Sequence, residues 1–262
     1  MHMKSRTQIN KLGNLLWAMV LGVSLTLVLS SCSKQEPTEG DGDSGDTSPS
    51  AGTAGFVALP ITLPKPQFVG TPTQIAGITN LEKPRGKARP PFLAPDGVTN
   101  VALGKSVTAS IEEPIMGEFA MIVDGDKEAM NGSLVELDPF LQSVTIDLEA
   151  EYDIYAVLFW HYHKQSRVYF DVVVQLADDA DFVENVRTIF NNDDDNSAGM
   201  GAGPDKHYVE VHEGKLLDAG GQKARYVRLY SQGNNSDDQN HYLEVEVYGK
   251  PAVGPARNNL DF

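Results

Sequence analysis

The chain has 262 residues, with 36 acidic and 21 Lys or Arg side chains and a formal net charge of −15 at pH 7. This acidic balance argues against nucleic acid and anionic membrane surfaces as partners, because both are negatively charged. The single Cys excludes an intramolecular disulfide, so we expect the fold to be stabilised by burial of apolar side chains, or by a metal.

The first 31 residues are typical of an export signal. Three basic residues and no acid precede an apolar run at residues 15–29. That run is shorter than a membrane-spanning helix requires and fits the core of a signal peptide. It ends in the sequence LSSC, which resembles a bacterial lipobox, where the Cys is lipidated and becomes the mature N-terminus. Residues 1–31 are therefore predicted to be a lipoprotein signal peptide, with Cys32 as the lipidation site.

Two alternatives remain for this N-terminus: an ordinary signal peptide with an incidental Cys, and an uncleaved membrane anchor. The lipoprotein interpretation places the protein in the bacterial cell envelope, where the lipid rather than electrostatic attraction would hold it at the membrane. The residue after Cys32 is Ser33 and not Asp. By resemblance to Gram-negative lipoproteins, this predicts transport to the outer membrane.

Two segments of unusual composition follow the signal. Residues 32–55 contain no large apolar side chain and carry several acids, which predicts a flexible acidic linker. Residues 56–97 contain eight of the 15 Pro residues, a density that excludes a helix or a central strand. Apolar residues between the prolines are too many for a pure linker, so we expect an extended segment that partly docks along the following domain.

The Pro-rich segment also carries a local cluster of basic side chains. Lys83, Arg85, Lys87 and Arg89 alternate along seven residues of an otherwise acidic chain. Because the whole protein is acidic, the cluster favours a contact with an acidic surface over a nucleic-acid site.

Residues 98–250 show the pattern of an all-β domain, and residues 251–262 form a short C-terminal tail. Short apolar runs with a period of two are separated by turn-rich segments, and no long helical period occurs. Many short strands within the length of one domain predict an antiparallel β-sandwich or jelly roll. The expected strands are residues 106–110, 144–148, 154–160, 168–176, 208–211, 226–230 and 241–248.

Residues 153–178 are predicted to be the central hairpin of this domain. Residues 154–160 are apolar on both faces, as expected of a strand in the middle of a sheet or with its second face covered. Residues 168–176 alternate and have one buried face. The polar loop between them would be held by two core strands, which is typical of a recognition loop, although a solvated turn is equally consistent.

Three segments in order resemble the coagulation-factor type C (discoidin) domain, a fold shared with galactose-binding-like carbohydrate-binding modules of family 32. They are residues 100–110, residues 120–126, and the pair 224–230 and 242–249, which would form the closing strands. The resemblance covers about 150 residues and implies an antiparallel jelly-roll β-sandwich.

The resemblance also implies a structural Ca²⁺ ion. Ca²⁺ binds six to eight hard oxygen ligands, and the glycine turn at residues 124–126 would let carbonyl oxygens converge. Ala129 stands where the family often has Thr, which removes one hydroxyl ligand, and an acidic turn without an ion is the alternative. By position in the match, the expected metal site comprises Met121, Asp124, Asp126, Ala129, Leu243 and Glu244.

The ligand-binding site is expected at loops at one end of the sandwich. A sugar offers apolar C–H patches beside fixed hydroxyls, so its site needs a flat ring next to planar hydrogen-bonding groups. Candidates occur in residues 161–167, in the acidic loop 191–197 and in residues 232–240; whether these loops meet is left open. The predicted ligand-binding residues are His161, Tyr162, His163, Arg167 and Asn192.

Alternatives exist for several of these residues. His161 and His163 could form part of a metal site, although a His-x-His pair alone is a weak signal. Residues 193–195 are most simply a solvated acidic run, with a second Ca²⁺ as the less favoured interpretation. Arg167 is expected either to bind ligand or to pair with Asp194 or a neighbour, which would make the loop structural.

No catalytic motif of the common hydrolase, metalloprotease or nucleotide-binding classes occurs, and a lipidated Cys32 leaves no nucleophilic thiol. We therefore expect a non-catalytic, lipid-anchored envelope protein that binds carbohydrate or a glycan. The alternative is a protein–protein docking or adhesion module that binds an envelope protein. A glycoside hydrolase would need two carboxylates in one pocket.

Overall fold

The computed structural model describes residues 55–130 and 132–252. The predicted signal peptide, Cys32, nearly all of the acidic linker and the last ten residues lie outside this range. Within it, the only helical element is a short 3₁₀ turn, η1 (Phe119–Val123), and no helix is long and apolar enough to cross a membrane. The predicted all-β class is confirmed.

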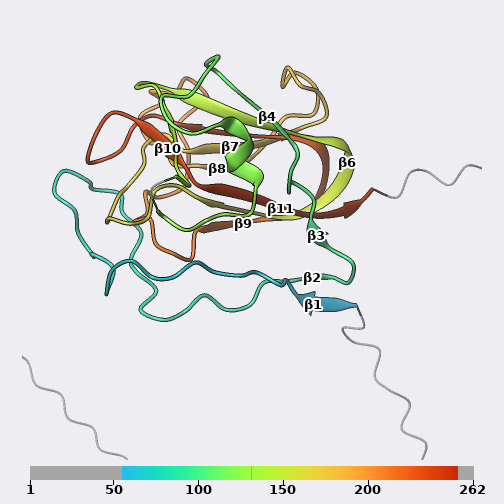
Figure 1. The fold of residues 1–262 in the computed structure, drawn as a ribbon, viewed down its shortest axis with the longest axis horizontal. Coiled ribbons are helices and arrows are strands. Elements are labelled where there is room, and N and C mark those ends of the chain that lie inside the picture. Colours follow the sequence, from blue (N-terminus) through green and yellow to red (C-terminus); the bar gives the residue numbers. More distant parts are fainter. Residues whose placement is uncertain (1–54, 131, 253–262) are drawn as a thin grey trace, which may run out of the picture. The chain divides into compact units, whose positions relative to one another are not determined.

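All pairings between the strands are antiparallel (Figure 1). The strands are β1 (Phe56–Ala58), β2 (Leu93–Pro95), β3 (Thr99–Asn100), β4 (Ser106–Ala109), β5 (Val135–Leu137), β6 (Gln142–Trp160), β7 (Val173–Ala177), β8 (Arg187–Asn191), β9 (Lys215–Ser231), β10 (Asn240–Tyr242) and β11 (Glu244–Pro251).

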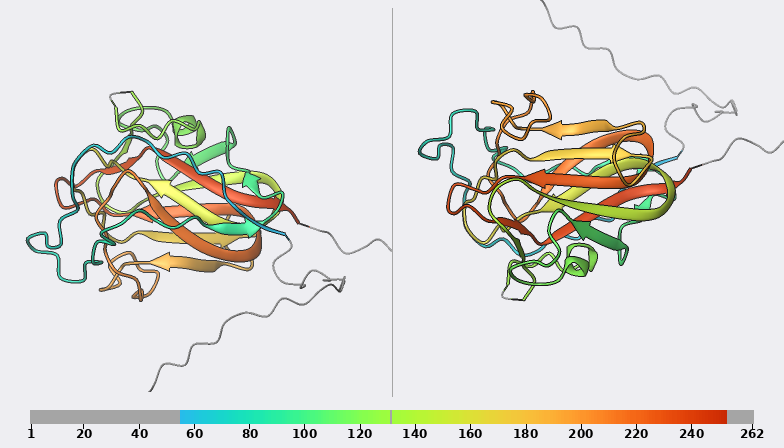
Figure 2. Two further views of the ribbon diagram at one scale, coloured as in Figure 1. Left: turned by 90° about the horizontal axis from the view of Figure 1, so that it is seen from below. Right: turned by 90° about the horizontal axis from the view of Figure 1, so that it is seen from above.

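Two long strands, β6 and β9, pair along most of their length and bend together to make a two-layered sandwich (Figure 2). A register shift between Asp147 and Tyr152 separates the two halves of β6. The first half of β6 pairs with β4, and the second half pairs with β11. One layer therefore holds β3, β11 and one half of the β6–β9 ribbon, and the other holds β4, β7, β8 and the other half.

The main core lies between these layers. Successive side chains of a strand point to opposite faces, so alternate residues of each half of β6 face the interior. Val144, Ile146, Val157 and Phe159 from β6 are fully buried in one cluster with residues of β7, β9 and β11. The period of two in residues 144–148 thus identifies the buried face of the first half of β6, whereas the second half is apolar on both faces.

A second apolar cluster lies on the outer face of β6 and β11. Leu158 and Trp160 point away from the main core, yet neither has exposed surface. They are covered by apolar residues of the Pro-rich segment at 56–97, which we call the strap, including Leu59 and Ala94. The strap runs along the domain in an extended conformation (Figure 1), so the strand that is apolar on both faces does have its second face covered.

The predicted hairpin at residues 153–178 is wrong in its pairing. β7 pairs with β9 on one side and β8 on the other, so β9 separates it from β6. Residues 168–172 are not part of β7, and Asp171 has a positive φ of 50°. The segment between β6 and β7 carries several buried side chains, so it packs across the end of the sandwich instead of making a tight turn.

Other strand predictions also differ from the structure, and the predicted strand at 226–230 is the last part of β9, which begins at Lys215. The predicted strands at 144–148 and 154–160 are two halves of the continuous β6. The predicted strand at 241–248 is divided at Leu243, because β10 pairs with β5 whereas β11 pairs with β6. Residues 208–211 form no strand, although they are buried or half-buried.

Candidate functional site

The three loops that carry the predicted ligand-binding residues lie together at one end of the sandwich. The Gln232 amide donates to the carbonyl of Phe170 at 2.9 Å, and the Asn192 amide donates to the carbonyl of Val172 at 3.1 Å. The segment between β6 and β7 is therefore bonded by its backbone to both of the other loops. The question that the sequence leaves open, whether these loops meet, is answered.

His161 and His163 are buried at this end and have no exposed surface. The Nδ1 atom of His161 lies 2.7 Å from Oε1 of Glu210, and its ring stacks on Tyr169 with centroids 4.3 Å apart. The Nε2 atom of His163 lies 3.0 Å from the carbonyl oxygen of Lys127. In this conformation both imidazoles hold the loop against the domain and present no surface to a ligand.

Arg167 pairs with an acid of the third loop and not with the 193–195 run. Its Nη1 atom lies 3.0 Å from Oδ2 of Asp237 and 3.3 Å from Nδ1 of His241. The guanidinium also lies over the half-buried ring of Tyr162, 4.9 Å from its centroid. The expected pairing of Arg167 with Asp194 or a neighbour is therefore wrong, while a ligand contact by Tyr162 and Arg167 stays a prediction.

Asn192 is a structural bridge between two loops. Its side chain has no exposed surface, its Oδ1 accepts from the Val172 amide at 2.7 Å, and its Nδ2 lies 3.5 Å from the Tyr169 carbonyl. A buried Asn that bonds to two backbone groups fixes loop geometry, and it is not available to a ligand.

An open concavity of about 350 Å³ lies at the junction of these loops and the strap. One wall is the half-buried ring of Phe170, which meets the ring of His207 edge-on at a centroid distance of 5.6 Å. Further polar groups include Asp171, Asp194 and Gln232. Burial raises the pKa of the Asp171 carboxyl above its ordinary value, and the nearby acids of residues 193 and 195 raise it further.

Three carboxylates converge at the edge of the concavity. Oxygens of Asp171, Asp193 and Asp195 lie within 4.8 Å of one another. Both oxygens of Asp193 accept backbone N–H bonds, from Ser197 and Ala198 at 3.0 Å each. Asp193 is therefore used in holding the loop, and the arrangement gives no independent sign of a bound cation.

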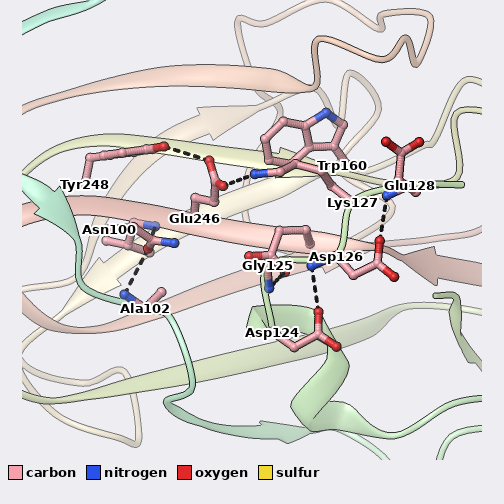
Figure 3. A network of polar contacts seen from close by, with 12 residues as sticks. Asn100, Ala102, Asp124, Gly125, Asp126, Lys127, Glu128, Trp160, Glu246 and Tyr248 are labelled. Atoms are coloured by element: carbon pink, nitrogen blue, oxygen red, sulfur yellow. Dashed lines mark hydrogen bonds and ion pairs between the residues drawn. The ribbon is translucent and has the colours of Figure 1, made fainter. Parts of the chain in front are cut away.

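The predicted calcium-binding turn does meet the last strand. The Gly125 amide donates to Oε2 of Glu244 at 3.0 Å, and Gly125 has a φ of 91°, which favours Gly. Asp124 and Asp126 each accept a backbone amide within the turn (Figure 3). The sequence prediction that this turn and Glu244 come together is confirmed, whereas the ion itself stays a prediction.

The carboxyl group of Glu244 is fully buried, and one of its oxygens, Oε1, has no hydrogen-bond partner among the described residues. Burial is the main cause that raises the pKa of this carboxyl to about 8. A cation beside Oε1 would remove this penalty, so the residues present fit a metal ion.

A neighbouring ion pair was not predicted. Lys127 pairs with Glu246, whose Oε2 accepts from the hydroxyl of Tyr248 at 2.8 Å (Figure 3). The ammonium of Lys127 also lies 5.0 Å from the centroid of the Trp160 ring. Glu246 is thus compensated within the protein, in contrast to Glu244.

No protein-family model matches the chain, and no curated protein matches it significantly. Among solved structures, the chain is similar to the CBM32 module of AlyQ in complex with 4,5-unsaturated mannuronic acid. The identity is 20% and the TM-score 0.40, over 54% of this chain and 92% of that one. It is also similar to a CBM32 module of Clostridium perfringens in complex with GlcNAc-α-1,4-galactose, at 17% identity and a TM-score of 0.42, over 59% and 96%. A fucose-binding module of Streptococcus pneumoniae matches at 18% identity and a TM-score of 0.40, over 57% and 97%.

Six residues of the concavity were not among the sequence candidates: Gly77, Ile78 and Thr79 of the strap, and Phe170, Asp171 and His207. Asp171 interrupts an apolar run, which is the one local signal that this position is not an ordinary strand residue. Nothing in the sequence marks His207, because its place is set by backbone bonds to the strap, to Asn80 at 2.9 Å and from Glu82 at 2.7 Å.

Proposed function

We propose that this protein binds carbohydrate, without catalysis, in the concavity formed by Phe170, Asp171, Asp194, His207 and Gln232. The observation that carries the proposal is the presence of an aromatic ring beside several hydroxyl-binding groups in one open site. The ring offers an apolar face to a sugar C–H patch, and carboxylate, imidazole and amide groups bind its hydroxyls. Its volume of about 350 Å³ lies in the range of small-molecule sites.

The rigidity of the site supports a binding role. Phe170, Asp171 and Gln232 lie on loops joined by backbone hydrogen bonds, and Asn192 and Arg167 fix the same loops from beneath. Side chains held in this way lose little conformational entropy when a ligand binds. Both oxygens of Asp193 accept backbone amides, so this carboxylate helps to hold the loop.

The proposal includes a structural Ca²⁺ ion held by the side chains of Glu244 and Asp124. Carbonyl oxygens of Met121, Asp126, Ala129 and Leu243 are the further ligands that we propose. The support is the buried Oε1 of Glu244, which has no partner within the described part of the chain. The ion would supply the positive charge that this carboxylate lacks and would fix the 124–126 turn against β11.

The proposal also includes lipid anchoring in the bacterial envelope, with the outer membrane as the site. The support is the sequence of residues 1–32, with its basic start, apolar core and LSSC end. A diacylated Cys32 would anchor the protein through its lipid chains. The acidic linker would then separate the binding domain from the membrane surface.

Two variants and a control test the concavity. Phe170→Leu keeps apolar bulk but removes the ring, and Asp194→Asn removes an exposed charge at the site. The control, Asp181→Asn, removes an exposed charge that does not line the concavity. A glycan array identifies a bound saccharide, and calorimetry measures its affinity for each variant. We expect a loss of roughly tenfold from each site variant, since ring contacts and charge-assisted hydrogen bonds are each worth about 1–2 kcal/mol.

Asp181→Asn is expected to retain the wild-type affinity, and the wild type is expected to release no reducing sugar from the bound glycan. Wild-type affinity in both site variants, with melting temperatures unchanged, would exclude this concavity. Absence of any saccharide binding by the wild type would overturn the proposed function itself.

A further inference from the structure

A second hollow, distinct from the concavity, lies between the strap and residues 208–216. It is a groove of about 620 Å³. One side is formed by strap residues 67–71 and 82–89, and the other by the segment that leads into β9. Because the strap precedes the predicted sandwich domain, half of this groove comes from outside the region of family resemblance.

The groove is positively charged in a strongly acidic protein. Five Lys or Arg side chains line it, against two carboxylates, Glu82 and Glu213. Lys215 pairs with Glu82 at 2.5 Å, and Arg85 pairs with Glu213, which also accepts the Arg89 amide at 2.9 Å. Both carboxylates therefore already form ion pairs, and three positive charges remain without a paired carboxylate in the groove.

The excess charge belongs to Lys83, Lys87 and Arg89. Among the described residues, no carboxylate pairs with the two lysines, which are exposed at the groove. Arg89 is half-buried and donates to the carbonyl of Gly214 at 3.1 Å, a neutral partner. Burial, and secondly the charge of Arg85, lower the pKa of Arg89 to about 10, as expected of a guanidinium without a full counter-charge.

The groove also has apolar walls. Phe68 is half-buried on the strap side, and Val211 and Leu216 are half-buried on the domain side. A nucleic acid is disfavoured because three charges are few for a phosphate backbone and the protein as a whole repels it. A short saccharide with one or two acidic groups matches both the charge and the apolar walls.

The groove and the concavity are adjacent. His207 lines the concavity and Tyr208 lines the groove, and the strap crosses between them where Leu81 forms a bridge with His207. One site is acidic and the other basic, so a glycan chain that spans both would place neutral sugars in the concavity and acidic sugars in the groove. A saccharide long enough to cross the strap at Leu81 would reach both surfaces, which favours an extended saccharide over a separate peptide.

We propose that the groove between Lys83, Lys87, Arg89 and residues 208–216 is a subsite for acidic sugars, such as uronates, of the glycan that the concavity binds. The inference rests on the proposed carbohydrate binding and adds the charge class of the ligand. The strap, and not the sandwich domain alone, would then determine the preference for acidic glycans.

The test compares one saccharide with and without its charge. Trigalacturonate and its methyl ester serve as probes, and hexaglutamate serves as an acidic peptide, each titrated into the full-length protein by calorimetry. The groove variant is Lys83→Gln with Lys87→Gln. The matched control is Lys65→Gln with Lys223→Gln, which removes the same charge from exposed positions that line neither site.

We expect the wild type to bind trigalacturonate more tightly than the ester, with a preference that declines as salt is added. The groove variant is expected to lose roughly fivefold in affinity for the acid, since exposed ion pairs contribute about 0.5 kcal/mol each. Its affinity for the ester, and both affinities of the control, are expected to stay unchanged.

Equal binding of acid and ester by the wild type, or an acid preference that survives in the groove variant, would overturn the inference. Hexaglutamate binding as tight as trigalacturonate would overturn it in favour of an acidic peptide. In each case, ester binding that is weakened by Phe170→Leu would leave the proposed function intact. If neither saccharide binds the wild type, the inference is overturned, whereas the proposed function is overturned only if the glycan array also finds no bound saccharide.

Discussion

Changing Glu244 to Gln tests the proposed calcium site through stability. The side chain is fully buried, its Oε2 accepts from Gly125, and its Oε1 has no partner within the described residues. Gln keeps the size and the acceptor for Gly125 but cannot ionise. The substitution therefore removes the charge that would hold the ion and leaves the packing in place.

The pKa of Glu244 gives the magnitude. Burial raises the pKa of this carboxyl from 4.5 to about 8 in the ion-free protein. The native state then binds more protons than the unfolded chain between these pH values, so the contribution of Glu244 to ion-free stability is largest below pH 4.5 and falls as pH rises toward 8. Calcium requires the ionised carboxylate, so its apparent affinity at about pH 6 is roughly a hundredfold weaker than at about pH 9.

Melting temperatures with and without added calcium measure this effect. Calcium at about a hundred times its dissociation constant adds about 2.7 kcal/mol to the free energy of unfolding, which raises the melting temperature by about 5–10 °C in a domain of this size. We expect this increase near pH 9 and almost none near pH 6 at the same calcium concentration. The metal is removed by dialysis beforehand, because chelators are themselves pH-dependent.

Glu244→Gln is expected to show no calcium response at either pH. Without calcium it is expected to melt above the wild type near pH 9, since it lacks a buried uncompensated charge. Glu149→Gln removes an exposed carboxylate that pairs with Lys105 at 2.5 Å, and it is expected to retain the calcium response. A calcium response that is equal at both pH values, or that survives in Glu244→Gln, would refute the assignment.

Four further predictions concern other parts of the chain. Cys32→Ala is expected to release the protein from the membrane fraction or leave it unprocessed, and a cleaved variant that still sediments with membranes would contradict lipidation. Burial lowers the pKa of His241 from 6.5 to about 4, so the contribution of the neutral imidazole to stability is expected to be lost as pH falls through this interval. The urea unfolding midpoint of the wild type should then fall more between these pH values than that of His241→Asn, and an equal fall in both proteins would contradict this role. Asn192→Ala is expected to cost roughly 1–3 kcal/mol in urea unfolding, because it leaves a buried amide unpaired. Gly214→Ala would place a Cβ 2.7 Å from the Trp160 ring, and we expect a lower melting temperature by calorimetry, at a cost of roughly 1–3 kcal/mol.

The sequence was sufficient for the fold class and for one long-range contact. The period of two in residues 144–148 and 226–230 shows which side chains are buried, and these strands are found in β6 and β9. The turn at residues 124–126 and Glu244 are more than a hundred positions apart, yet their contact was predicted from the order of three family-like segments. Information of this kind is contained in local patterns and their order.

The pairing of β7 could not be predicted in the same way. Alternation in residues 168–176 predicts a strand with one buried face, whereas four of the five residues of β7 are buried, and a buried strand can pair equally well beside β6 or beside β9. The choice is decided by the bulky segment that follows Trp160. Its His161, His163 and Tyr169 side chains are buried, so the chain crosses the end of the sandwich before β7 begins.

The candidate site escaped prediction for a related reason. Phe170, Asp171 and His207 meet only because three loops and the strap are brought to the same end by the bent β6–β9 ribbon. A single His between polar residues carries no local signal of its position. The residues selected from the sequence are the ones that hold these loops in place, such as Asn192, and not those that face the open space.

The strap connects stability with recognition in this protein. Its apolar residues cover Leu158 and Trp160, while residues 77–79 line the concavity and residues 82–89 line the groove. Because Pro restricts the backbone in the unfolded chain as well, an extended Pro-rich segment loses less entropy when it docks than an ordinary loop would. It also presents few unpaired N–H groups at an exposed edge, so it can line two binding surfaces without offering an edge for further strands. The packing of the strap on the outer face of β6 would therefore hold both the concavity and the groove in their binding conformations.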